Sequence, residues 1–154
     1  MALTVGTNSY ISLDYADSYA SSTMRYDEWS VYDNQESALK FATILLENRV
    51  RWYGCKTSSS QTLQWPRRGL LDRYNKAVDS STVPEIVKQI QAELAFYMME
   101  NKPMVINNGI EHMDFEGLSM NLKANKQTIP WKIFSPVSIF GELLDGAPAT
   151  RLHR

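Results

Sequence analysis

The sequence predicts a mainly α-helical fold: a small helical bundle with a β-hairpin and an extended C-terminal arm. Apolar side chains recur at helical spacing over residues 33–52 and 84–99, whereas they alternate on both sides of Glu116-Gly117. The composition, with 44% hydrophobic and 21% charged residues over 154 positions, is typical of one folded domain with an arm. We expect a helical core at residues 1–104, a hairpin extension at 105–130, a closing helix at 131–146 and an arm at 147–154.

The N-terminal half contains two predicted helices. Ser12 can accept a hydrogen bond from a free backbone N–H and so cap a helix that runs through Tyr19. A clearer helix extends from Asp33 to Trp52, and Ala38, Phe41, Ala42, Leu45 and Trp52 form its apolar stripe. Residues 54–60, Gly-Cys-Lys-Thr-Ser-Ser-Ser, show no periodicity and therefore predict an exposed loop.

The second long helix is predicted to begin at Pro84, which suits a first helical position because its missing N–H would have no partner there. Its apolar stripe consists of Val87, Ile90, Leu94 and Tyr97, and Asn101-Lys102-Pro103 ends it. We expect this helix and the helix at 33–52 to form the core.

The segment after residue 104 changes period. Met113 and Phe115 alternate before Glu116-Gly117, and Leu118, Met120 and Leu122 alternate after it. A two-residue turn would place Phe115 opposite Leu118 and Met113 opposite Met120. A final helix is expected to begin near Ser135-Pro136 and end by Gly146, with Val137, Ile139, Phe140, Leu143 and Leu144 as its apolar positions.

Charge and cysteine content narrow the functional classes. The net charge of -1 supplies no general attraction for nucleic-acid phosphates or anionic membranes. No stretch approaches the roughly 20 apolar residues of a membrane span, and the N-terminus lacks the pattern of a signal peptide. The single cysteine, Cys55, cannot form an internal disulfide. We expect a soluble, unexported protein with no membrane partner.

Candidate catalytic and metal sites are weak. His112, Asp114 and Glu116 share the polar face of the first hairpin strand, but a solvated strand face explains them better, because structural zinc sites normally want four ligands. Cys55 lacks a glycine-framed nucleophile turn, and no glycine-rich phosphate loop occurs. We therefore expect no enzyme, no metal and no cofactor.

The most distinctive string is Trp65-Pro66-Arg67-Arg68-Gly69, and it permits two readings. In a single-strand binder, Trp65 would stack on a base while the arginines bind phosphate. In a structural reading, Trp65, Pro66 and Arg67 anchor the long connection between the two core helices, and the arginines pair with acidic neighbours such as Asp72. The structural reading is favoured, because large aromatic side chains mostly contribute buried area and two arginines are few for a phosphate track.

With its flanks, this string resembles a known family over about residues 7–98. The matching segments are Tyr10-Ile11-Ser12-Leu13 with Ala16-Asp17 and Tyr19, Glu36-Ser37-Ala38-Leu39 with Ala42-Thr43, Trp52-Tyr53-Gly54, Leu63-Gln64-Trp65-Pro66-Arg67-Arg68-Gly69 with Asp72, Val83-Pro84-Glu85-Ile86-Val87, and Ala92-Glu93-Leu94-Ala95. The family is that of tailed-phage head-tail connector or adaptor proteins, often labelled DnaT-like single-stranded-DNA-binding proteins. One departure is Asn75-Lys76, which replaces the family's more usual glycine-containing turn.

The resemblance implies a structural virion protein in the neck between head and tail, assembled in the host cytoplasm. Such a protomer forms a homo-oligomeric ring, commonly a dodecamer, below the portal protein. The ring extends the channel through which double-stranded DNA passes without sequence-specific binding, and it offers an attachment surface to a tail or stopper protein. Each protomer then needs two different complementary surfaces.

The expected docking residues lie in the C-terminal third. We expect Phe115 and Leu118 of the hairpin and Arg151, Leu152, His153 and Arg154 of the arm to contact the portal or neighbouring copies. The alternative function is that of a DnaT-like single-stranded-DNA-binding module.

Overall fold

The structure is a computed structural model that describes residues 2–100, 112–115, 118–121 and 131–144. The predicted mainly α fold is confirmed. Its helices are α1 (Leu13–Ser22), α2 (Tyr26–Ser30), α3 (Gln35–Arg49), α4 (Glu85–Glu100) and α5 (Trp131–Phe134), followed by the 3₁₀ helix η1 (Ser135–Ile139). Within the described ranges, no helix combines the length and the apolar character needed to cross a membrane.

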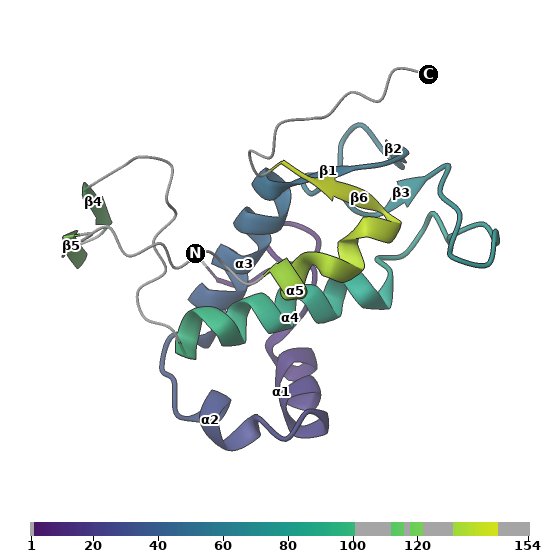
Figure 1. Cartoon of the computed structure of the whole chain (residues 1–154). Helices are drawn as coiled ribbons and strands as arrows, with labels where there is room; N and C mark the ends of the chain where they lie inside the picture. The colour runs from purple at the N-terminus through teal and green to yellow at the C-terminus, as the bar shows by residue number, and fades with distance from the viewer. Residues whose placement is uncertain (1, 101–111, 116–117, 122–130, 145–154) are drawn as a thin grey trace.

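Helices α3 and α4 pack against each other and form the centre of the molecule, as the sequence predicts (Figure 1). Leu39 and Leu46 of α3 and Leu94 of α4 are fully buried between them. One buried polar side chain belongs to this contact. The Gln91 amide of α4 donates to the Leu39 carbonyl at 3.0 Å and to Ser9 Oγ at 2.7 Å, and its oxygen accepts from the Tyr10 N–H at 2.9 Å. Gln91 therefore ties the N-terminal segment to both core helices.

The predicted cap of the first helix is confirmed. Ser12 Oγ accepts a hydrogen bond from the Tyr15 N–H at 3.1 Å, which satisfies one of the free donors of the first turn. Helix α2 was not expected, because five residues are too few to show a helical period. It forms because Trp29 is buried against Phe96 of α4, with ring centroids 4.7 Å apart.

A long-range strand pair corrects two predicted helix ends. Strand β1 (Val50–Trp52) pairs antiparallel with β6 (Gly141–Leu143), with Val50 opposite Leu143 and Trp52 opposite Gly141. The helix expected to reach Trp52 therefore ends at Arg49, and the helix expected to reach Gly146 is wrong from residue 141 onward. Pairing gives the backbone of both segments hydrogen-bond partners that helical spacing along the sequence does not reveal.

A second strand pair corrects the loop expected at residues 54–60. Strand β2 (Cys55–Lys56) pairs antiparallel with β3 (Arg67–Arg68), with Cys55 opposite Arg68. Cys55 is exposed, but it lies in a strand. The turn into β2 uses Gly54 at φ +66, where a Cβ would collide with the Arg68 carbonyl oxygen. Only glycine allows the two strands to approach this closely.

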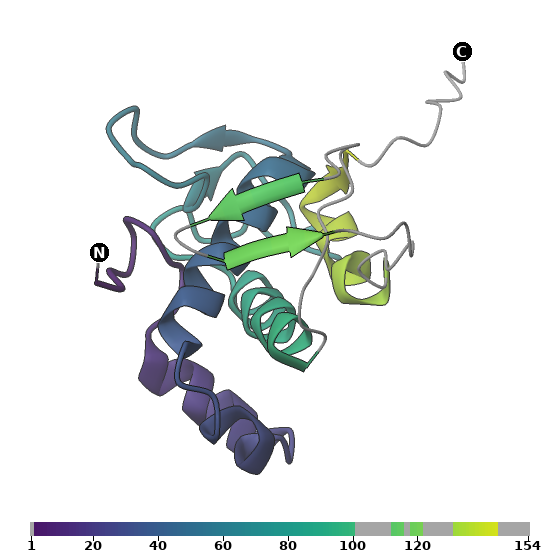
Figure 2. The same cartoon turned by 90° about the vertical axis from the view of Figure 1, so that its left-hand side faces the viewer.

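The predicted hairpin register is confirmed. Strands β4 (His112–Phe115) and β5 (Leu118–Asn121) pair antiparallel, with Phe115 opposite Leu118 and Met113 opposite Met120. Figure 2 shows them as two adjacent antiparallel arrows. The remainder of the hairpin extension and the arm at 147–154 lie outside the described residues.

Candidate functional site

Trp65 lies in the interior, on the connection between β2 and β3. It is 2% exposed and meets two aromatic rings edge to face: Trp52 of β1 at a centroid distance of 5.4 Å, and Phe140, directly before β6, at 5.5 Å. The Trp65-Pro66 peptide bond is cis. The Pro66 carbonyl accepts hydrogen bonds from the Thr57 N–H at 3.2 Å and from Gln61 Nε2 at 3.0 Å. The segment is thus fixed to the β1–β6 pair on one side and to its own connection on the other.

Arg67 is buried and surrounded by hydrogen-bond acceptors. Its guanidinium donates to the carbonyls of Tyr53 at 2.7 Å, Gly54 at 2.8 Å and Trp52 at 3.4 Å. It also donates to the carbonyl of Gln64 at 3.1 Å and to the Gln64 side-chain oxygen at 2.8 Å. Burial lowers the pKa of Arg67 from its usual value. The side chain therefore joins the turn after β1 to the segment before β3.

The expected pairing of the arginines with Asp72 is wrong for Arg67. Asp72 Oδ1 instead accepts hydrogen bonds from the Tyr74 N–H at 2.8 Å and the Lys76 N–H at 2.9 Å. These backbone contacts, with the Lys76 N–H first, lower the pKa of Asp72. They close a tight turn in which Asn75 adopts φ +60. Asparagine tolerates this left-handed conformation better than most residues, so it can occupy a position that otherwise favours glycine.

The surface around the Asp72 turn is basic and partly apolar. We call Arg68, Leu71, Arg73, Tyr74 and Lys76 the basic end; all five are exposed, with Tyr74 at 73% and Leu71 at 55%. The sequence analysis singled out Arg68 together with Trp65 and Arg67, but it missed Leu71, Arg73, Tyr74 and Lys76. Their signal was present in the density of basic residues between positions 67 and 76, but their exposure depends on the fold.

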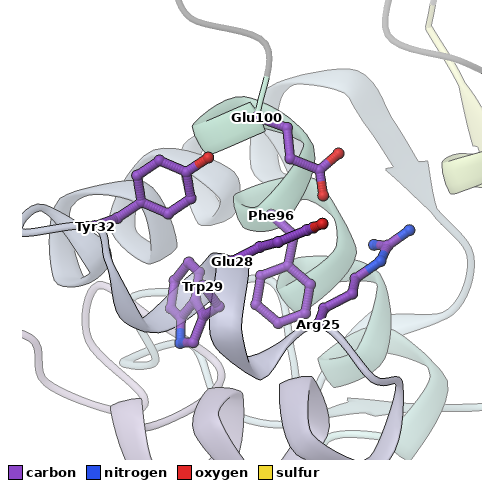
Figure 3. Close-up of a pocket in the computed structure, with 6 residues that line it drawn as sticks. All are labelled: Arg25, Glu28, Trp29, Tyr32, Phe96 and Glu100. Atoms are coloured by element: carbon purple, nitrogen blue, oxygen red, sulfur yellow. The ribbon is translucent and has the colours of Figure 1, made fainter.

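Helix α2 encloses a small cavity against α4, shown in Figure 3. Trp29 and Phe96 form its apolar side, and Arg25, Glu28 and Glu100 stand around it. Its volume of about 10 Å³ has room for about one water molecule. Two of the surrounding polar groups have partners elsewhere, because Trp29 Nε1 donates to Asp17 at 2.8 Å and Arg25 pairs with Glu93 at 2.8 Å. This cavity is a packing feature of α2 rather than a ligand site.

Two larger hollows lie beside α5 and η1. One, of about 270 Å³, is lined by Ile86 and Glu93 of α4 and by Lys132 of α5, among others. The other, of about 260 Å³, lies next to Tyr53 and Glu142. Both are slightly smaller than the roughly 300–1,000 Å³ of typical small-molecule pockets.

Glu47 is a partly buried carboxylate that is hydrogen-bonded to other parts of its own chain. It accepts hydrogen bonds from the Tyr10 hydroxyl and from the Gln64 N–H, the latter at 3.0 and 3.2 Å to its two oxygens. Burial raises the pKa of Glu47, and burial together with Glu47 raises the pKa of Tyr10. The carboxylate connects the N-terminal segment, α3 and the Trp65 segment.

The other predicted site residues are only partly placed. The backbones of Phe115 and Leu118 face each other in the hairpin, while their side chains and residues 151–154 lie outside the described part of the chain. The same holds for the side chains of His112, Asp114 and Glu116. Among the residues with described side chains, no three potential metal ligands from His, Cys, Asp and Glu come together.

Comparison with known proteins gives one match. The sequence model of the family described as "Putative DnaT-like ssDNA binding protein" matches residues 2–114, a range that begins before α1 and includes both core helices and the Trp65 segment. No curated protein and no solved structure matches the chain. Because the match covers well over half of the sequence, the chain belongs to this DnaT-like family.

Proposed function

We propose that the protein is a structural protomer of the tailed-phage neck, one copy of a head-tail connector ring below the portal. Its proposed partners are further copies of itself, the portal protein and a tail or stopper protein, with double-stranded DNA passing through the channel. The ordered resemblance of residues 7–98 to connector proteins supports this role. The DnaT-like label that such proteins often carry agrees with the description of the matching family. The proposal includes no catalytic activity and no cofactor.

The observation that carries the proposal is the burial of Trp65 and Arg67. A single-strand binder needs aromatic faces on which bases stack and cationic groups that reach phosphates. This segment offers neither group. The ring of Trp65 packs on Trp52 and Phe140, and the guanidinium of Arg67 donates to five acceptors of its own chain. The segment stabilises a scaffold, as a structural protomer requires.

A second candidate function is single-stranded-DNA binding, and two observations favour it. The family description names it, and the basic end combines three cations with the exposed ring of Tyr74. In that case Arg68, Arg73 and Lys76 would contact phosphates, whereas Arg67 would not.

A salt-dependent titration with a labelled oligonucleotide separates the two functions. A true binder loses affinity steeply as salt rises, and Arg73→Glu with Lys76→Glu would abolish the binding. A connector shows no binding at low salt and instead associates with purified portal protein. Deletion of residues 147–154 is expected to abolish portal association while circular dichroism shows an unchanged helical core. Portal association that survives this deletion would contradict the role assigned to the arm, and absence of association with the full chain would contradict the connector function.

A further inference from the structure

Opposite ends of the described structure carry opposite charge. We call Met24, Tyr26, Asp27, Glu28 and Val31 the acidic end; all five are exposed and lie on or beside α2. Arg25 lies among them, but its guanidinium pairs with Glu93 at 2.8 Å. The basic end lies on β3 and the turn that follows it. Figures 1 and 2 agree that α2 and the β2–β3 region are at opposite ends of the molecule.

Both ends also expose large apolar side chains. Met24 is 95% exposed and Val31 72% exposed at the acidic end, and Tyr74 and Leu71 are exposed at the basic end. Single exposed apolar residues are ordinary, but here they stand beside charged groups, with Met24, Tyr26 and Val31 at the acidic end and Leu71 and Tyr74 at the basic end, and so offer each end apolar area for an interface.

Met24 adds a separate argument from the backbone. It adopts φ +61 directly after the C-cap of α1, where the Arg25 N–H bonds to the Ala20 carbonyl at 2.8 Å. Glycine usually occupies this left-handed position, and another residue there costs roughly 1 kcal/mol. A methionine gains nothing in the monomer that offsets this cost, because its side chain is almost entirely in solvent.

From these observations we propose that the acidic end of one copy docks on the basic end of the next copy, in a head-to-tail contact. The two surfaces are complementary in charge, and each supplies apolar side chains for the centre of an interface. Because they are different surfaces on opposite ends, the contact is heterologous and repeats from copy to copy. The inference rests on the proposed ring and names the surfaces that join its protomers.

Asp72 lies in the same turn as the basic end and remains negatively charged, because the N–H groups of Tyr74 and Lys76 stabilise its carboxylate. The three cations Arg68, Arg73 and Lys76 outnumber it, so the basic end is positively charged. DNA is the other polyanion that they could attract. The acidic end favours a second copy, because a surface with Asp27 and Glu28 repels DNA and has no role in binding it.

Charge reversal on each end tests the contact. The variants are Asp27→Lys with Glu28→Lys, and Arg73→Glu with Lys76→Glu. The control is Lys132→Glu, a charge reversal at an exposed residue outside both ends. Sedimentation velocity of the full chain at low and high salt measures association, and circular dichroism verifies folding. We expect the wild type and the control to associate, and each reversal to weaken association at least about tenfold, because like charges then face each other.

The decisive measurement mixes the two reversed proteins. In an alternating assembly every junction is complementary again, since the reversed acidic end meets the reversed basic end and the two unchanged ends meet each other. We expect the mixture to associate as the wild type does. Restoration also shows that both variants are folded.

A wild type that remains monomeric at high concentration and low salt would overturn the inference, as would a mixture that does not associate. If the basic-end reversal abolishes binding of an oligonucleotide while the wild type stays monomeric, the basic end is a DNA surface. The portal assay distinguishes the two proposals. Portal association without self-association refutes only the head-to-tail contact, and self-association without portal association refutes only the connector function.

Discussion

Replacement of Arg67 by methionine is the most informative perturbation. Methionine retains much of the aliphatic length but removes all five hydrogen bonds to Trp52, Tyr53, Gly54 and Gln64. Bonds to a charged donor contribute roughly 1.5–3 kcal/mol each, so even the lower figure gives about 7.5 kcal/mol in total. Two corrections reduce this value. Removing a buried cation recovers several kcal/mol of desolvation, and the carbonyls of the exposed residues Tyr53 and Gly54 can bind water instead.

We therefore expect Arg67→Met to lower the free energy of unfolding by about 3 kcal/mol, which corresponds to roughly 6–12 °C in Tm for a domain of this size. Urea unfolding followed by tryptophan fluorescence and circular dichroism measures the change. Arg67→Lys keeps the charge but loses the planar fork, so an intermediate loss is expected.

Arg68→Met is the matched control, because Arg68 lies in the same strand and is exposed. Its expected effect on stability is within about 0.5 kcal/mol of zero. If Arg67→Met costs less than about 1 kcal/mol, or no more than the control, the structural role of Arg67 is refuted. The same proteins test the DNA reading, since a phosphate-binding Arg67 would lose affinity without losing stability.

Three further predictions concern the same region. Trp65→Ala is expected to lower the free energy of unfolding by about 3–5 kcal/mol in a thermal unfolding assay. Trp65→Phe should cost under about 1.5 kcal/mol, because Trp65 Nε1 has no hydrogen-bond partner to lose among the described residues. Equal losses for the two variants would contradict the packing argument. Gly54→Ala should destabilise the protein by about 2 kcal/mol or more, and Gly69→Ala by only about 1 kcal/mol. Both glycines have a positive φ, but only Gly54 faces a backbone carbonyl. The reverse order of the two variants in urea unfolding would refute this account. Because burial raises the pKa of Glu47 in the folded state, the free energy of unfolding should fall as pH rises from about 4.5 through that raised pKa. Over this range the native state still holds a proton that the unfolded state has released. A Glu47→Gln variant whose stability has the same pH slope as the wild type would contradict this assignment.

Two carboxylates with a lowered pKa, those of Asp72 and Asp79, act in a different pH range from Glu47. The pKa values of Asp72 and Asp79 are lowered by hydrogen bonds, for Asp72 chiefly from the Lys76 N–H and for Asp79 chiefly from the Ser81 N–H. A lowered pKa contributes stability that is present above the unfolded value and is lost as pH falls through the folded value. Their effect therefore lies below the pH range in which Glu47 acts.

The sequence alone determined the local structure of the chain. Ser12 as a cap, the two long helices and the register of Phe115 opposite Leu118 were all predicted, because each depends on residues within a few positions of one another. Side-chain periodicity and capping chemistry act over this short range, and the pattern of residues records them directly.

The tertiary structure decided what depends on distant residues. Strand β1 stops the helix at Arg49 because β6, some ninety positions later, offers it hydrogen bonds. Arg67 was expected to find a carboxylate, but folding surrounds it with carbonyl oxygens, which every residue carries and no sequence pattern marks. The separation of the acidic and basic ends arises in the same way. Composition gives only a net charge near zero, and the packing of α2 and the turn after β3 on opposite ends of the core turns that balance into two complementary surfaces.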